Sequence, residues 1–100
     1  MKDRVILVFG GAGGIGAECA RRLAEEGARV LTADLRGGDV DCDITDPAAC
    51  ERAAQAAVDR HGRLDGMVNC AGVSRPHDSL TLPPEEWARM VDVQLNGAFY

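Results

Sequence analysis

Short apolar runs alternate along this chain with longer stretches in which apolar residues recur every three or four positions. The short runs predict strands at residues 5–9, 29–33, 40–43 and 64–69, the third of them brief. The first run is apolar without interruption, as expected for a parallel strand covered on both faces. Helical periodicity predicts helices at residues 17–26, 47–61 and 84–98. Strands that alternate with helices predict an α/β fold built of parallel β-α-β units.

Residues at the ends of the predicted helices support this assignment. Gly27 is placed to end the first helix and Gly62 to end the second. Asp46 is expected to be an N-cap, because Pro47 suits the first helical position. The first helix is expected to bury a face made of Ile15, Cys19, Leu23 and Ala24, and the last helix a face made of Trp87, Met90, Val91, Leu95 and Ala98.

A glycine-rich stretch, Phe-Gly-Gly-Ala-Gly-Gly-Ile-Gly at residues 9–16, joins the first strand to the first helix. Glycine permits positive φ and lets backbone N–H groups approach an anion with no Cβ in the way. The amino end of the following helix directs further unpaired N–H groups at the same anion. The stretch therefore predicts a seat for the pyrophosphate of a dinucleotide. The other interpretation is a tight turn that binds nothing.

The five glycines of this stretch fit three spacing patterns. Gly11-x-Gly13-x-x-Gly16 matches the general dinucleotide-binding fingerprint. The patterns Gly10-x-x-Gly13-x-x-Gly16 and Gly10-x-x-x-Gly14-x-Gly16 fit as well. The choice among the three depends on the rest of the chain.

Asp34 ends the second predicted strand, 18 residues after Gly16. An acid at about this distance from the glycine turn accepts hydrogen bonds from the adenosine ribose hydroxyls. Its carboxylate also repels a 2′-phosphate, so the sequence predicts NAD in preference to NADP. Hydrogen bonds to a charged group are worth about 1.5–3 kcal/mol, which is roughly tenfold or more in affinity.

Two further motifs follow the later strands: Asp-Ile-Thr-Asp at residues 43–46 and Asn-Cys-Ala-Gly at residues 69–72. They resemble the adenine-contacting Asp-Val motif and the Asn-Asn-Ala-Gly motif of the short-chain dehydrogenase/reductase family. The helix at 87–99 is similar to the helix that runs past the active site of that family. The motifs occur in the family's order over nearly the whole chain, and the resemblance favours the pattern Gly10-x-x-x-Gly14-x-Gly16.

The resemblance implies a Rossmann-type doubly wound parallel sheet in strand order 3-2-1-4, with the later strands missing. Residues 1–100 are then the N-terminal portion of a single dinucleotide-binding domain. The first and fourth strands meet where the strand order reverses, and ligands bind in that crevice. The implied roles are a pyrophosphate seat at Gly10, Gly14, Ile15 and Gly16, a ribose contact at Asp34, adenine contacts at Asp43 and Ile44, and a cofactor border at Asn69, Ala71 and Gly72.

Several positions depart from the family's pattern. Phe9 stands where the family usually has threonine, and Cys70 replaces the second asparagine of its motif. The family's usual additional helix has no room between the second and third strands, which predicts a more open adenine side. The active-site asparagine would fall at Gln94, and Asn96 lies about 200° around the helix from that position. Gln94 either holds a water through its amide or marks a helix kink, and we give it no catalytic role.

The resemblance also implies a catalytic serine and a Tyr-x-x-x-Lys pattern, in which a tyrosine exchanges the proton while hydride moves. Tyr100 and Lys2, the only tyrosine and lysine, stand near opposite ends of the chain. We therefore expect the N-terminal, NAD-binding part of a longer NAD-dependent enzyme, inactive by itself, that acts on a small alcohol or carbonyl substrate. The alternative is a non-catalytic nucleotide-binding or interaction module.

Composition argues against several other partners. The net charge of −5 and the scattered cations argue against nucleic acid, and no apolar stretch approaches the ~20 residues of a membrane span. The four cysteines form no Cys-x-x-Cys pair, and neither His61 nor His77 has an acid or cysteine at ligand spacing, so we predict no metal site. The lack of a signal peptide predicts a cytoplasmic protein. The resemblance implies a homo-oligomer, because the family usually assembles through the last predicted helix.

Overall fold

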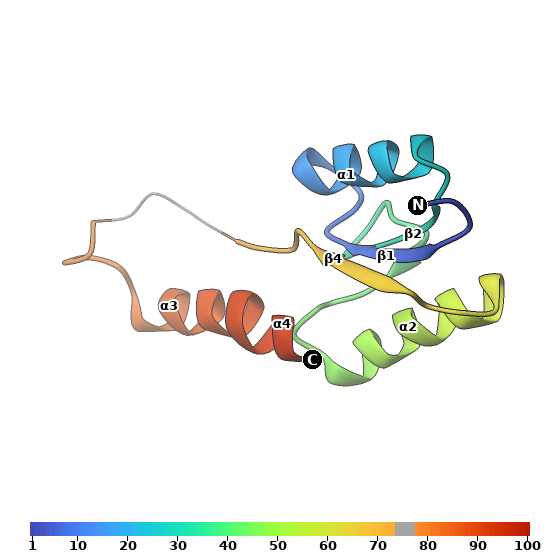
Figure 1. The fold of residues 1–100 in the computed structure, drawn as a ribbon. Coiled ribbons are helices and arrows are strands. Elements are labelled where there is room, and N and C mark those ends of the chain that lie inside the picture. The colour runs from blue at the N-terminus through green and yellow to red at the C-terminus, as the bar shows by residue number, and fades with distance from the viewer. Residues whose placement is uncertain (74–77) are drawn as a thin grey trace.

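The computed structural model describes residues 1–73 and 78–100 (Figure 1). Its elements are β1 (Val5–Phe9), α1 (Gly14–Glu25), β2 (Arg29–Asp34), β3 (Val40–Asp41), α2 (Pro47–His61), β4 (Gly66–Asn69), α3 (Pro84–Val91), η1 (Asp92–Asn96) and α4 (Gly97–Phe99). The last three form one continuous rod, in which η1 is a π-helical turn. All predicted strands and helices are present, and their ends differ from the predicted ones by at most three residues.

The four strands form one parallel sheet in the order β3-β2-β1-β4, which confirms the predicted doubly wound arrangement. β1 lies inside the sheet, where Leu7 is opposite Leu31 of β2 and Met67 of β4. Figure 1 shows α1 on one face of the sheet and α2 and the rod on the other. Among the described residues, β4 pairs with β1 alone, so its outer side is an open sheet edge.

β1 is apolar throughout because both of its faces are covered. Its odd-numbered residues join a core cluster that includes Ala53 of α2. Its even-numbered residues, Ile6 and Val8, join a second cluster with Leu23 of α1. Each fully buried side chain of this kind is worth about 1.5–3 kcal/mol, so the sheet is the rigid base on which the surrounding turns are positioned.

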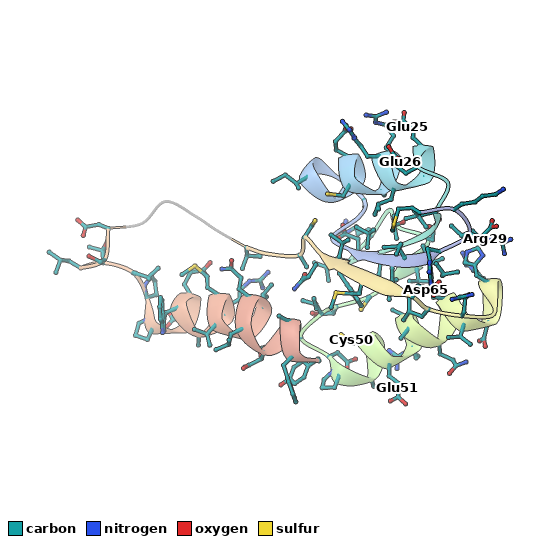
Figure 2. All side chains as sticks on the ribbon, in the orientation of Figure 1. Glu25, Glu26, Arg29, Cys50, Glu51 and Asp65 are labelled. Atoms are coloured by element: carbon teal, nitrogen blue, oxygen red, sulfur yellow. The ribbon has the colours of Figure 1, made fainter. Side chains whose placement is uncertain are left out.

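The second helix, α2, begins and ends where the sequence predicted. The Asp46 carboxylate accepts a hydrogen bond from the Ala48 N–H at 3.0 Å, as an N-cap does. At the other end, the N–H of Gly62 donates to the Val58 carbonyl at 2.7 Å. Figure 2 shows Glu51 directed away from the sheet, so the charged side of α2 faces outward.

The buried face of α1 differs in part from the prediction. Gly16 is buried and Leu23 is half-buried, but Ile15 is 78% exposed and Ala24 is exposed as well. The reason is the close approach of Gly16 to the backbone of Gly10. Neighbouring helix positions lie about 100° apart, so fixing Gly16 against the turn directs Ile15 to the outside.

The rod α3-η1-α4 also buries a different face from the predicted one. Val93 and Gly97 are its buried residues, whereas Trp87 is 60% exposed and Leu95 67% exposed. A π-helical turn takes more residues than an α-helical turn, so η1 displaces every later position from the expected face. The amino-terminal end of the rod extends beyond the sheet (Figure 1), which leaves the Trp87 region exposed.

Candidate functional site

A cavity of about 1070 Å³ opens beyond the carboxyl ends of β1, β2 and β4. In this strand order, the ends of β1 and β4 lie at the reversal point, where ligands bind in doubly wound sheets. Six of the residues predicted from the sequence line the cavity: Gly10, Asp34, Asp43, Ile44, Ala71 and Gly72. The other four do not line it: Gly14 and Asn69 adjoin lining residues in the chain and Gly16 packs against Gly10, whereas Ile15 is 78% exposed.

The glycine-rich turn is held between the end of β4 and α1 by backbone contacts. Gly10 has φ of 73°, and a Cβ added there would lie 2.7 Å from the Ala71 nitrogen. A Cβ added at Gly16 would lie only 1.9 Å from the Gly10 carbonyl oxygen. Gly13 and Gly14, in contrast, have nothing within 4 Å of an added Cβ. The turn is therefore closely packed on the protein side and open at its centre.

Hydrogen bonds separate the N–H groups of this turn into two sets. Gly10 donates to the Ala33 carbonyl at 2.8 Å, and Ala12 donates to Asp34 Oδ2 at 3.1 Å. The first N–H groups of α1, which begins at Gly14, have no partner within the helix. These groups are the ones free to bind an anion at the open centre of the turn.

Asp34 joins this turn to the end of β2. Its carboxylate is half-buried and accepts from Ala12 at 3.1 Å through Oδ2 and from the Leu35 N–H at 2.8 Å through Oδ1. A carboxylate has about four acceptor positions, so two remain for a ligand donor. Asp34 also lines the wall of the large cavity.

Asp43 and Ile44 follow β3 at the far side of the cavity. Asp43 Oδ1 accepts from the Thr45 hydroxyl at 2.7 Å and from the Thr45 N–H at 3.0 Å. These two bonds, and to a lesser extent the positive charge of Arg89, lower the pKa of the Asp43 carboxyl. Ile44 is buried and provides an apolar wall.

The Asn69 side chain shapes the chain after β4 without lining the large cavity. Its Oδ1 accepts from the Ala71 N–H at 3.0 Å, which turns the chain at the end of the strand. Asn69 lines a smaller cavity of about 240 Å³ between β4, α2 and α4. Asn69 therefore supports Ala71, which does line the large cavity.

The rod contributes polar residues that the sequence reasoning missed. Arg89, Asp92 and Asn96 line the cavity, and the Asn96 amide donates to Asp92 Oδ1 at 3.1 Å. Together with Val93 they form the side of the rod that lines the cavity, and the π-helical turn at residues 92–96 hides this side from an analysis based on α-helical periodicity. Gln94 does not line the cavity, and its Nε2 donates to the Val73 carbonyl at 3.0 Å, so it ties the chain after β4 to the π-helical turn.

Among the described residues, no group of three or more His, Cys, Asp or Glu side chains is arranged to hold a metal, and no helix is long and apolar enough to span a membrane. His61 ends α2, whereas His77 lies outside the described residues. Tyr100 lines the smaller cavity.

Known protein families and relatives agree on one group of enzymes. Residues 10–100 match the family described as "Enoyl-(Acyl carrier protein) reductase". The chain is 38% identical to "Short-chain dehydrogenase reductase 5" of Arabidopsis thaliana, over 98% of this chain and 44% of that protein. It is 35% identical to "D-threitol dehydrogenase" of Mycolicibacterium smegmatis, over 99% of this chain and 45% of that protein.

Solved structures give the same result. A short chain dehydrogenase from Mycobacterium smegmatis matches with a TM-score of 0.90 at 32% identity, over 98% of this chain and 48% of that one. The 3-ketoacyl-(acyl-carrier-protein) reductase from Brucella melitensis, complexed with NADH, matches with a TM-score of 0.89 at 29% identity, over 98% of this chain and 47% of that one. The chain thus spans a little under half the length of the relatives it matches.

Proposed function

This chain belongs to the short-chain dehydrogenase/reductase family, and from that premise we propose that it is the NAD-binding half of an oxidoreductase acting on an alcohol or carbonyl substrate. The observation that carries the proposal is the cavity at the carboxyl ends of β1, β2 and β4, with a glycine-rich turn and an acid in its wall. A dinucleotide has the complementary parts, because its pyrophosphate suits the turn and its ribose hydroxyls suit the acid.

The residues around the cavity fit such a cofactor. The space beside Gly13 and Gly14 leaves room for phosphate oxygens next to the free N–H groups of α1. We assign the binding of the pyrophosphate to the N–H groups of Gly14, Ile15 and Gly16. We assign a further contact to Gly10, where the backbone has no Cβ and can come close to the pyrophosphate. We assign the remaining contacts to Asp34 for the ribose, Asp43 and Ile44 for the adenine, and Asn69, Ala71 and Gly72 for the border of the site.

Charge in the cavity favours NAD over NADP. Asp34, Asp43 and Asp92 bring three carboxylates to the wall, and Arg89 is the one cation among the described lining residues. A 2′-phosphate would place further negative charge beside Asp34, whereas a ribose hydroxyl would donate a hydrogen bond to it. The same carboxylate that attracts NAD therefore repels NADP.

The bound nicotinamide would supply the hydride chemistry of the reaction. The residues of this chain hold and orient it, and we assign the proton transfer to a part of the enzyme outside residues 1–100. A relative named for D-threitol and a structural neighbour named for a 3-ketoacyl group support an alcohol or carbonyl substrate.

Titration of the full-length protein with NADH and NADPH, followed by nicotinamide fluorescence, tests the proposal. Asp34→Asn removes the charge and keeps an oxygen that can still accept from Ala12 or Leu35. We expect the affinity for NADH to fall about tenfold. The ratio of the NADH affinity to the NADPH affinity should fall by about tenfold or more.

Asp59→Asn is the control for this titration, because Asp59 is an exposed residue of α2 outside the cavity. It should change neither affinity. Equal affinity for the two cofactors, unaltered by Asp34→Asn, would refute the preference for NAD. Failure to bind either cofactor would refute the proposed function as a whole.

We also assign the enzyme to the cytoplasm as a homo-oligomer. The four cysteines are free, as is usual in reducing compartments. The exposed Trp87 and Leu95 provide an apolar surface on the rod for a second subunit. Sedimentation of the full-length protein should show a dimer or tetramer that Trp87→Ser weakens, and a monomer at micromolar concentration would contradict the assignment.

A further inference from the structure

Cys70 and Cys19 face each other between the sheet and α1. The Cys70 N–H donates to the Phe9 carbonyl at 2.9 Å, so the β1–β4 ladder extends to Cys70. Side chains alternate along a strand, and Cys70 is therefore on the same side as Val68, which packs in the core cluster under α1. On α1, Leu23 belongs to that cluster, and Cys19 lies one turn before it on the same face.

The Cys19 and Cys70 thiols both lie in the layer between α1 and the sheet. Both are free and half-buried. Burial raises the pKa of the Cys70 thiol, and a hydrogen bond and charge interaction with Cys19 raise this pKa further.

Cys70 is also part of the cavity wall, and its backbone supports the glycine-rich turn. A Cβ added at Gly10 would lie 2.7 Å from the Cys70 carbonyl carbon and 2.8 Å from its oxygen. Nothing separates the two backbones, so a movement of Cys70 by a few tenths of an ångström is passed directly to Gly10. A bond formed at the Cys70 sulfur would therefore shift the glycine-rich turn that we assign to the pyrophosphate.

We propose that Cys19 and Cys70 form an oxidisable pair whose disulfide links α1 to the end of β4 and lowers affinity for the dinucleotide. The effect on affinity rests on the proposed function, whereas formation of the disulfide does not. Disulfides in reducing compartments are typically transient and redox-sensing. A disulfide that links α1 to the residue packed against Gly10 would make cofactor binding depend on the thiol balance of the cell.

The oxidant required is a low-molecular-weight disulfide. One thiolate of the pair attacks a sulfur of that disulfide, so that a mixed disulfide forms and the first thiolate of the oxidant leaves. The second cysteine of the pair then attacks the protein sulfur and releases the other thiolate. Two protein thiols are oxidised to one disulfide, the oxidant is reduced to two thiols, and the two protons pass to those products.

Cys42 and Cys50 provide a matched pair inside the same chain. Both are buried, and burial together with Cys50 raises the pKa of Cys42 to about 12. The Cys50 thiol also donates to the Ile44 carbonyl at 3.5 Å. Figure 2 shows Cys50 on the sheet side of α2, away from α1. This second pair should react far more slowly than the first.

The test is oxidation of the reduced full-length protein with oxidised glutathione, followed by alkylation, peptide mapping and NADH titration. We expect a Cys19–Cys70 linked peptide, and an NADH dissociation constant about fivefold higher, corresponding to the loss of roughly one hydrogen bond to the phosphates. A reductant should reverse both changes. The rate should rise about tenfold per pH unit below the thiol pKa, because the thiolate is the reacting form.

After treatment with the oxidant, Cys19→Ser should keep the NADH affinity that the protein has in its reduced form. Cys42→Ser should respond to the oxidant as the unsubstituted protein does. Cys70→Ser checks the same point from the other side of the pair. Absence of the linked peptide, a stable mixed disulfide at Cys70, or a linked protein with unchanged NADH affinity would overturn the inference. A reduced protein that does not bind NADH would instead refute the proposed function, and the peptide map would still decide whether the pair closes.

Discussion

The two helical regions that border the cavity are held by different kinds of contact. α1 meets the glycine-rich turn backbone to backbone, since a Cβ at Gly16 would lie 1.9 Å from the Gly10 oxygen. The rod meets the rest of the protein mainly through side chains: a Cβ at Gly97 would lie 2.9 Å from Ile44 Cγ2, with the Ile44 carbonyl oxygen at 3.2 Å, and Gln94 reaches the Val73 carbonyl at 3.0 Å. Backbone contacts cannot adjust, whereas side chains can rotate away.

This difference predicts which side of the cavity tolerates substitution. The pyrophosphate side is fixed by the fold itself, and changes there should affect folding and binding together. The side formed by the rod rests on a few adjustable contacts, so changes there should act locally. Four substitutions test this contrast, from the largest expected effect to the smallest.

Gly16→Ala should have the largest effect. The added methyl group overlaps the Gly10 carbonyl, and relieving the overlap must move α1 or the turn. We expect the free energy of unfolding to fall by about 3 kcal/mol, measured by urea denaturation, with loss of NADH binding. Gly13→Ala is the matched control, because its Cβ would meet nothing within 4 Å. If both variants unfold at the same urea concentration, the turn is not closely packed and the comparison fails.

Gly97→Ala should have a smaller effect. Its added methyl group would lie 2.9 Å from Ile44 Cγ2 and 3.2 Å from the Ile44 carbonyl oxygen, which is a milder overlap than the 1.9 Å at Gly16, and alanine favours a helix by about 1 kcal/mol over glycine. We expect a net loss of about 1 kcal/mol or less, with thermal denaturation as the measurement. A loss as large as that of Gly16→Ala would show that the rod is as rigidly held as α1.

Gln94→Glu should act only near the rod. It keeps the size of the side chain but removes the N–H group that donates to Val73. The bond is exposed, so we expect about 1 kcal/mol or less. Amide hydrogen exchange should become faster in η1 and remain unchanged in β1. Equal acceleration in both elements would mean that the rod and the sheet open as one unit, contrary to the comparison.

Thr45→Val should have the smallest effect, a small loss of stability that is present near neutral pH and disappears in acid. The Thr45 bonds lower the pKa of Asp43 in the folded protein. Their stabilising contribution is therefore present above the unfolded pKa of about 3.9 and is lost as the pH falls through the lower folded value. NMR titration should show the pKa of Asp43 rising in the variant. The loss of stability should be the same at pH 6 and pH 8, which lie above both pKa values, and should vanish as Asp43 becomes protonated in acid. An unaltered Asp43 pKa would refute the role of the hydroxyl.

Most of the sheet and its first two helices could be predicted because their signals are local. The apolar run at β1, the cap at Asp46 and the glycine at position 62 each act within a few residues of where they stand. The cavity position was predictable too, because a parallel sheet with this strand order brings the ends of β1 and β4 together. The inward face of the rod was not predictable, because η1 breaks the period on which the prediction depended.

Within the site, sequence spacing identified Gly10, Asp34 and Asp43 because motif residues at strand ends lie at one edge of a parallel sheet. It did not find Arg89 or Asp92, since their contribution depends on where the rod crosses that edge. The rod is positioned by packing against Ile44, far from it in sequence.

The sequence by itself therefore determined the order of the elements, the turn between β1 and α1, and the family to which the chain belongs. Tertiary structure alone decided that Gly16 packs on Gly10, that Asn69 supports Ala71 from outside the cavity, and that Cys19 and Cys70 lie on facing sides of α1 and the sheet. The physical reason is the range of the interactions. Backbone preferences and periodicity act over a few residues, whereas these contacts join residues brought together only when α1 and β4 pack on β1.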